Sequence, residues 1–143
     1  MKYLYLIIAS AFAVAFTSCK EADAEADASF AKSTFEALAR GDSSAADNID
    51  WETLNSLGTP VGSTYSAMQK EEDKAAFRKN FIAQFSSSFR DSGGKLEDFT
   101  NWRVTTHDDT HTEVSADGPN GTMVITVSER NDVERVSVLE LAQ

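Results

Sequence analysis

The chain has 143 residues, with 23 acidic and 13 basic side chains and a formal net charge of −10 at pH 7. This length suits one domain rather than several. Because the basic residues are scattered and outnumbered, the composition excludes nucleic acid as a partner and argues against direct docking on an anionic membrane surface. An acidic surface usually serves solubility, and it leaves cationic ligands or basic partners open.

The N-terminus has the pattern of an export signal. Lys2 precedes an apolar run over residues 3–16, and Thr17, Ser18 and Cys19 follow. A run of this length falls in the range of a signal-peptide core and is shorter than the roughly 20 residues that span a bilayer. The sequence therefore predicts a signal peptide over residues 1–18.

The segment Phe16-Thr17-Ser18-Cys19 resembles the lipobox of bacterial lipoproteins, in which the cysteine receives a lipid on its thiol and becomes the first mature residue. Phe16 departs from the leucine that is commonest at its position. The resemblance implies attachment through Cys19 to a membrane of the bacterial cell envelope. We expect the periplasmic face of the outer membrane, with the cell surface as an alternative. An ordinary signal peptide would instead leave one unpaired thiol in an exported chain.

Residues 19–28 are expected to link the lipid to the domain. Residues 20–28 read KEADAEADA, with no large apolar side chain to bury. A helix would place acids four residues apart, which is unfavourable. The sequence therefore predicts a disordered or extended acidic tether that reaches about 30 Å at roughly 3.3–3.6 Å per residue. A lysine followed by acids after a lipidated cysteine also resembles a surface-export signal of some Gram-negative phyla.

Residues 29–143 are predicted to form a single α+β domain, with helices first and strands second. The first helix covers residues 29–40 and ends at Gly41, and it places Phe30, Thr34, Ala37 and Leu38 on one face. Two short helical turns follow, and residues 58–66 read as a loop with room for one short strand.

The strongest predicted helix covers residues 71–92. Its most regular feature is a phenylalanine at every fourth position, namely Phe77, Phe81, Phe85 and Phe89. Such a stripe is usually core. The alternative is an apolar ligand pocket lined by Phe77, Phe81, Phe85 and Trp102.

Beyond Lys95 the apolar period changes from four to two, which indicates strands. Four strands are predicted, over residues 99–106, 111–117, 122–130 and 133–141, with tight turns between them. Consecutive strands joined in this way form an antiparallel meander. We expect its concave face to pack on the phenylalanine stripe, because neither surface can be buried alone.

The order of the segments FxxxxFEALARGD, NIDWETL and KAAFRKNFIAQFSSSF, followed by a four-strand meander, resembles the nuclear transport factor 2-like (cystatin-like α+β) fold. The resemblance covers nearly all of residues 29–143. It implies a curled sheet closed by helices into a cone, with a pocket between the long helix and the sheet. It implies no single function, since this fold serves enzymes, ligand binders and dimeric scaffolds.

The two histidines lie at a predicted hairpin tip, which is unsuited to a tuned general base, and no catalytic residue is assigned. If Asp108–Thr110 form a three-residue loop, His107 and His111 face each other and make a weak zinc candidate. A polar turn is the alternative and is favoured by Asp and Thr. No metal or other cofactor is expected.

The sequence thus predicts a lipid-anchored envelope protein that acts as a non-catalytic module and binds a small apolar ligand or another envelope protein. An enzyme of the ketosteroid isomerase or dehydratase type, acting in the cone, is the alternative. A homodimer formed through the outer face of the sheet is also expected from the resemblance.

Overall fold

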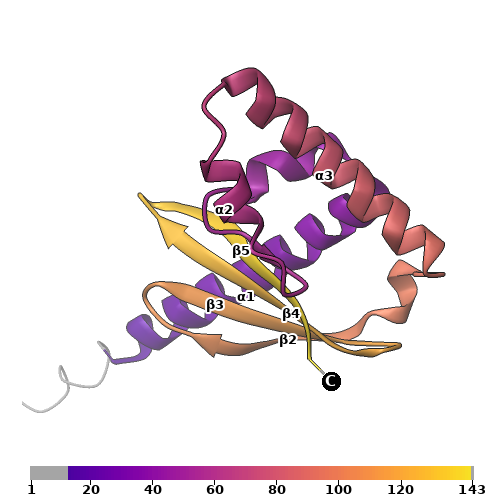
Figure 1. The fold of residues 1–143 in the computed structure, drawn as a ribbon. Helices are drawn as coiled ribbons and strands as arrows, with labels where there is room; N and C mark the ends of the chain where they lie inside the picture. Colours follow the sequence, from indigo (N-terminus) through magenta and orange to yellow (C-terminus); the bar gives the residue numbers. More distant parts are fainter. Residues whose placement is uncertain (1–12, 143) are drawn as a thin grey trace, which may run out of the picture.

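The computed structural model describes the backbone of residues 13–142 and the side chains of residues 20–142. Most of the predicted signal peptide and the side chain of Cys19 lie outside the described residues. The α+β class is confirmed (Figure 1), and the elements in chain order are α1 (Ala13–Arg40), η1 (Ser43–Asn48), β1 (Asn55–Ser56), α2 (Val61–Ser66), α3 (Glu71–Asp91), η2 (Leu96–Asp98), β2 (Thr100–His107), β3 (His111–Gly118), β4 (Gly121–Arg130) and β5 (Val133–Ala142).

The sheet has five strands in the order β1-β5-β4-β3-β2. Strands β2 to β5 form the predicted antiparallel meander. The prediction of a purely antiparallel four-stranded sheet is wrong, because β1 joins β5 in parallel and pairs Asn55 with Val138. A strand of two residues is too short for alternation to reveal it. The predicted loop at residues 58–66 contains α2, which begins directly after Pro60.

Helix α1 is the main departure from the prediction, since residues 20–28 belong to it and are not extended. Alanine alternates with the acids in this stretch and has the highest intrinsic helix propensity. The like-charged Glu21 and Glu25 are both exposed, so that solvent screens their repulsion. The buried face of α1 runs at intervals of three and four residues through Asp27, Ala31, Thr34, Phe35 and Leu38. This stripe extends the predicted helix N-terminally and ties it to the sheet.

The layer next to the sheet is α1 and not α3. Helix α1 contacts strands β2 to β5, whereas the main contacts of α3 are with α1 and η1. Figure 1 shows α1 crossing behind the sheet and continuing behind α3. The prediction that the phenylalanine stripe packs directly on the sheet is therefore wrong. Phe35 explains the arrangement, because this side chain is 1% exposed and stands between the two layers.

The strand faces follow the predicted alternation. Met123, Ile125 and Val127 of β4 are buried in the core, and Val124 is half-buried on the other face. In β2, Trp102 is half-buried against the core, whereas Arg103 is exposed and lies 2.9 Å from Asp117. The sheet thus presents an apolar face to α1 and a more polar face to solvent.

Candidate functional site

The candidate anchoring residue, Cys19, lies within α1, eight positions before Asp27. Its side chain is outside the described residues, so that lipidation stays a prediction. Across residues 13–142, helices of sufficient length lack the apolar stretch that a membrane span requires.

The aromatic candidates come together in one cluster that continues the core. Phe77 and Phe81 meet Trp51 edge-on, with ring centroids 6.4 and 5.4 Å apart. Phe85 and Trp102 contact Phe35, at 6.4 and 6.0 Å. All four candidates are half-buried and pack against core rings. The two hollows described below are lined by other residues.

The two histidines lie on opposite faces of the β2–β3 hairpin, contrary to the expectation that they face each other. His107 pairs with Thr112, whereas His111 pairs with Ser128 of β4. The register changes between Val104 and Thr106, where Thr105 forms an extra residue in β2. Without this bulge the pairing of Val104 with Val114 would continue to His107 and His111, so a one-residue slip moves His111 to the other face.

The hairpin turn is held by Asp108. Its Oδ1 accepts hydrogen bonds from the backbone N–H of Thr110 at 2.7 Å, from the Thr110 hydroxyl at 2.7 Å and from the backbone N–H of His111 at 3.0 Å. The hydrogen bonds from Thr110 lower the pKa of Asp108 to about 2. Within the described residues, no group of three or more His, Cys, Asp and Glu side chains is arranged to hold a metal ion.

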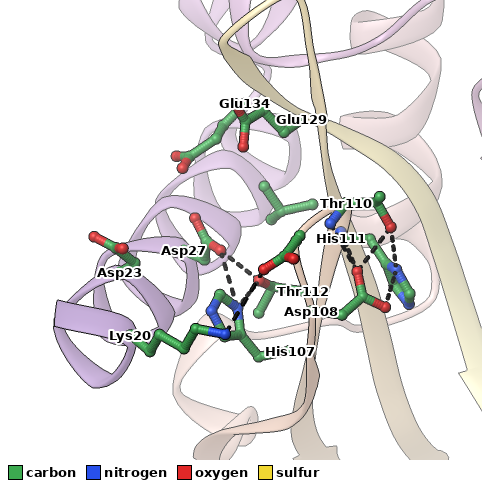
Figure 2. A pocket seen from close by; sticks show the side chains of 12 residues that line it. Lys20, Asp23, Asp27, His107, Asp108, Thr110, His111, Thr112, Glu129 and Glu134 are labelled. Carbon is green, nitrogen blue, oxygen red and sulfur yellow. Dashed lines mark hydrogen bonds and ion pairs between the residues drawn. The ribbon is translucent and has the colours of Figure 1, made fainter. Parts of the chain in front are cut away.

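An acidic hollow of about 230 Å³ lies where the N-terminal half of α1 meets the β2–β3 turn and the β4–β5 hairpin (Figure 2). We call this site the acidic hollow, and the side chains that line it are Lys20, Asp23, Asp27, His107, Asp108, Asp109, Thr110, His111, Thr112, Val127, Glu129 and Glu134. Six of these described side chains are carboxylates and one is an ammonium. The acidic hollow therefore favours positive charge.

Asp27 is the buried acid of this hollow and is 6% exposed. Its Oδ2 accepts a hydrogen bond from the hydroxyl of Thr112, and its Oδ1 is buried without a partner among the described residues. Figure 2 shows Asp27 reaching from α1 toward Thr112 and His107. A buried carboxylate with one unpartnered oxygen costs free energy unless positive charge or a proton compensates it.

His107 extends this hydrogen-bonded chain. Its Nδ1 lies 2.7 Å from the hydroxyl oxygen of Thr112 and 3.9 Å from Oδ2 of Asp27. Thr112 donates its only hydroxyl hydrogen to Asp27. The hydroxyl oxygen of Thr112 therefore accepts the hydrogen bond from the Nδ1–H of His107. The imidazole is thus oriented by the buried acid through one threonine.

After Asp108, Glu134 is the second acid of the hollow whose pKa is shifted. Glu134 is an exposed residue, and its pKa is raised first by partial desolvation of the carboxyl group and then by the negative charge of Asp27. Glu129 and Asp23 contribute in the same direction. The raised pKa of Glu134 indicates that no positive charge close to this carboxyl group compensates its negative charge.

A second hollow, of about 360 Å³, lies between η1 and α3. Its floor is largely apolar and includes Ala46 and Ile82, and its rim carries Arg78 and Lys79. The Arg78 guanidinium donates a hydrogen bond to the phenolic oxygen of Tyr65 at 2.6 Å. This hydrogen bond holds the Arg78 side chain to Tyr65 of the same domain.

The sequence did not predict the acidic hollow, because its walls come from α1 and all four strands of the meander. The local sequence around Asp27 instead predicts a disordered or extended tether. The available signal was the helical spacing of Asp27, Ala31 and Thr34, which continues the buried stripe of α1 toward the N-terminus.

Comparison with known proteins does not place the chain in a family, since no family model, no curated protein and no solved structure matches it.

Proposed function

We propose that this protein is a lipid-anchored module of the bacterial cell envelope that binds an organic cation in the acidic hollow without catalysing a reaction. The observation that carries the proposal is the buried carboxylate of Asp27, whose Oδ1 lacks a partner among the described residues and which lines the hollow together with five further acids. An ammonium or guanidinium group supplies the positive charge and the N–H donors that such a site lacks.

The size of the hollow limits the ligand. A volume of about 230 Å³ is below the roughly 300–1,000 Å³ of pockets that enclose drug-sized molecules. The hollow therefore suits the charged head of a molecule rather than a whole drug-sized ligand.

Cation binding can be tested by NMR on isotope-labelled protein at low ionic strength, with methylammonium, guanidinium and choline as probes. We expect shift changes at the amides of Asp27, Thr112 and Glu134, and a loss of affinity of about tenfold in Asp27→Asn. Glu72→Gln on α3 removes the same kind of charge outside the hollow and is the matched control. Equal effects of the two variants, or shifts confined to other surfaces, would contradict the proposal.

Anchoring through Cys19 is supported by the apolar run, the small residues before the cysteine and the absence of any other cysteine in the sequence. Two or more acyl chains bind a membrane stably, at roughly 0.8 kcal/mol per buried methylene. We expect the wild-type chain in the membrane fraction, and Cys19→Ser in the soluble fraction with altered gel mobility. A Cys19→Ser protein that stays membrane-bound and unshifted would show that the anchor is wrong.

We also propose that residues 29–143 have a nuclear transport factor 2-like fold whose cone is filled by aromatic side chains. The order of the long helix and meander, together with a fifth strand at the sheet edge, supports this proposal. A homodimer remains an expectation, which light scattering on the mature protein tests.

A further inference from the structure

The helical course of α1 determines how far the acidic hollow can stand from the anchor. Cys19 and Asp27 belong to the same helix, in which each residue advances about 1.5 Å. Their Cα atoms are therefore about 12 Å apart along the axis, whereas an extended chain would separate them by roughly 26–29 Å. A helix tilted toward the membrane brings the hollow closer still.

This distance exceeds the thickness of a lipid headgroup layer by only about 4–7 Å. A bilayer has a hydrocarbon core of about 30 Å and a total thickness of about 40–45 Å, which leaves about 5–8 Å of headgroup on each side. With Cys19 held at that surface, the hollow opens within reach of the headgroups of neighbouring lipids.

The charges of the hollow are ordered along α1. Lys20 directly follows the anchoring position, and Asp23 and Asp27 lie one and two turns farther along. The ammonium of Lys20 is 71% exposed and lies 3.8 Å from Asp109, which is 92% exposed, so this ion pair is weak. Along α1 itself, the order from the anchoring position is thus one positive charge followed by two negative charges.

A zwitterionic headgroup has the complementary order. Its phosphate lies next to the lipid glycerol, and its ammonium is at the outer end. Lys20 is placed to pair with the phosphate, while Asp23, Glu129 and Glu134 surround the space for the ammonium. A lipid that carries only negative charge lacks the group that the acids would bind.

The lining also distinguishes a primary from a quaternary ammonium. Quaternary ammonium groups are usually held over the faces of Trp, Tyr or Phe. The described lining contains carboxylates, hydroxyls and two imidazoles but none of those three rings. A primary ammonium offers three N–H donors to carboxylate oxygens, whereas a quaternary ammonium offers none.

We propose that the acidic hollow captures the primary ammonium of an ethanolamine-type lipid headgroup in the same membrane leaflet that holds the lipid on Cys19. Lys20 pairs with the phosphate of that lipid, and the contact holds the domain close to the membrane. The proposal rests on the proposed function, because it requires both the anchor and the cation site.

Carbodiimide coupling tests the proposal directly, because it joins a carboxyl group to a primary amine in contact with it by an amide bond. The full lipidated protein is reconstituted in vesicles of phosphatidylcholine with or without phosphatidylethanolamine, and the coupled peptides are identified by mass spectrometry. We expect lipid amides at Asp23, Glu129 or Glu134 only when the ethanolamine lipid is present. Amides mainly on α3 acids such as Glu71 and Glu72, or no lipid amides, would overturn the headgroup site.

A pair of lysine variants tests the charge order. Lys20→Gln is expected to reduce lipid coupling about threefold. Lys32→Gln removes an exposed charge on α1 outside the hollow and is the matched control. Equal losses in the two variants would overturn the role of Lys20.

Coupling of free ethanolamine distinguishes the proposal of cation binding from the proposal of a lipid headgroup site. In the Cys19→Ser protein, coupling of free ethanolamine at the hollow together with absent lipid coupling in the wild type would overturn the headgroup inference and leave cation binding intact. Absence of both would overturn cation binding as well. Recovery of the wild-type chain in the soluble fraction would overturn the anchor and the headgroup inference with it.

Discussion

Thr112 donates a hydrogen bond to the buried carboxylate of Asp27 and so joins the N-terminal half of α1 to β3. The two residues are separated by 85 positions in the chain, and their exposed fractions are 1% and 6%. This contact brings a segment that the sequence assigns to a tether into the folded domain, and it places an acid at the base of the acidic hollow.

Replacing Thr112 with valine should destabilise the domain. The isosteric change leaves the Asp27 carboxylate buried and without its hydrogen-bond donor, which costs about 1–3 kcal/mol in the free energy of unfolding. Urea denaturation followed by tryptophan fluorescence measures the difference. Thr106→Val removes an exposed hydroxyl that contacts Glu113 and should change stability by less than about 0.5 kcal/mol. Equal costs for the two variants would show that burial of Asp27 is unimportant.

Glu134 should make the domain less stable as the pH rises. A carboxyl group whose pKa is raised on folding binds its proton more tightly in the folded state, so its favourable contribution is complete below the unfolded value of about 4.5. That contribution is lost as the pH rises through the folded pKa. We therefore expect Glu134→Gln to gain stability relative to the wild type as the pH rises above about 4.5.

Melting temperatures of both proteins across this pH range measure the effect of Glu134. Glu140→Gln, on the same strand and outside the lining of the hollow, is the control. A difference between Glu134→Gln and the wild type that does not change with pH would contradict the interpretation.

Much of the fold could be predicted because its signals are local. The four-residue spacing of phenylalanines gives α3 to within one residue at its C-terminal end, and the change to a period of two gives the strands of the meander. The glycine that ends α1 was also identifiable, since Gly41 has φ +74°.

The candidate site could not be predicted, because it depends on contacts between distant segments. The bulge at Thr105 separates the two histidines, and the sequence of β2 alone gives no sign of it. Residues 20–28 form part of α1, and Asp27 of this stretch accepts a hydrogen bond from Thr112 of β3, which lies 85 positions away in the chain. Because the sequence gives no sign of the contact between Asp27 and Thr112, the prediction of a tether is wrong and the acidic hollow is not predicted.

Phe35 should be the most sensitive aromatic position. Its ring meets four others, and the nearest is Phe99, with centroids 4.9 Å apart. Phe35→Ala removes a fully buried ring between two layers, and we expect a loss of about 3–5 kcal/mol. Phe77→Ala, at a half-buried position, should cost about 1–2 kcal/mol. Urea denaturation distinguishes the two, and a larger loss at Phe77 would contradict the central place of Phe35.

Asp108 should have the opposite pH dependence to Glu134. Hydrogen bonds from Thr110 lower the folded pKa of Asp108 from 3.8 to about 2, so the stabilising contribution is present above pH 3.8 and is lost as the pH falls toward 2. Asparagine can still accept in the turn but cannot titrate, so we expect Asp108→Asn to be destabilised relative to the wild type at about pH 6 and to approach it at about pH 2. Asp109→Asn, at the neighbouring position with a side chain that is 92% exposed, is the control. Urea denaturation at both pH values measures the free energy of unfolding. If the loss in Asp108→Asn relative to the wild type is the same at about pH 6 and at about pH 2, the charge of Asp108 does not stabilise the turn.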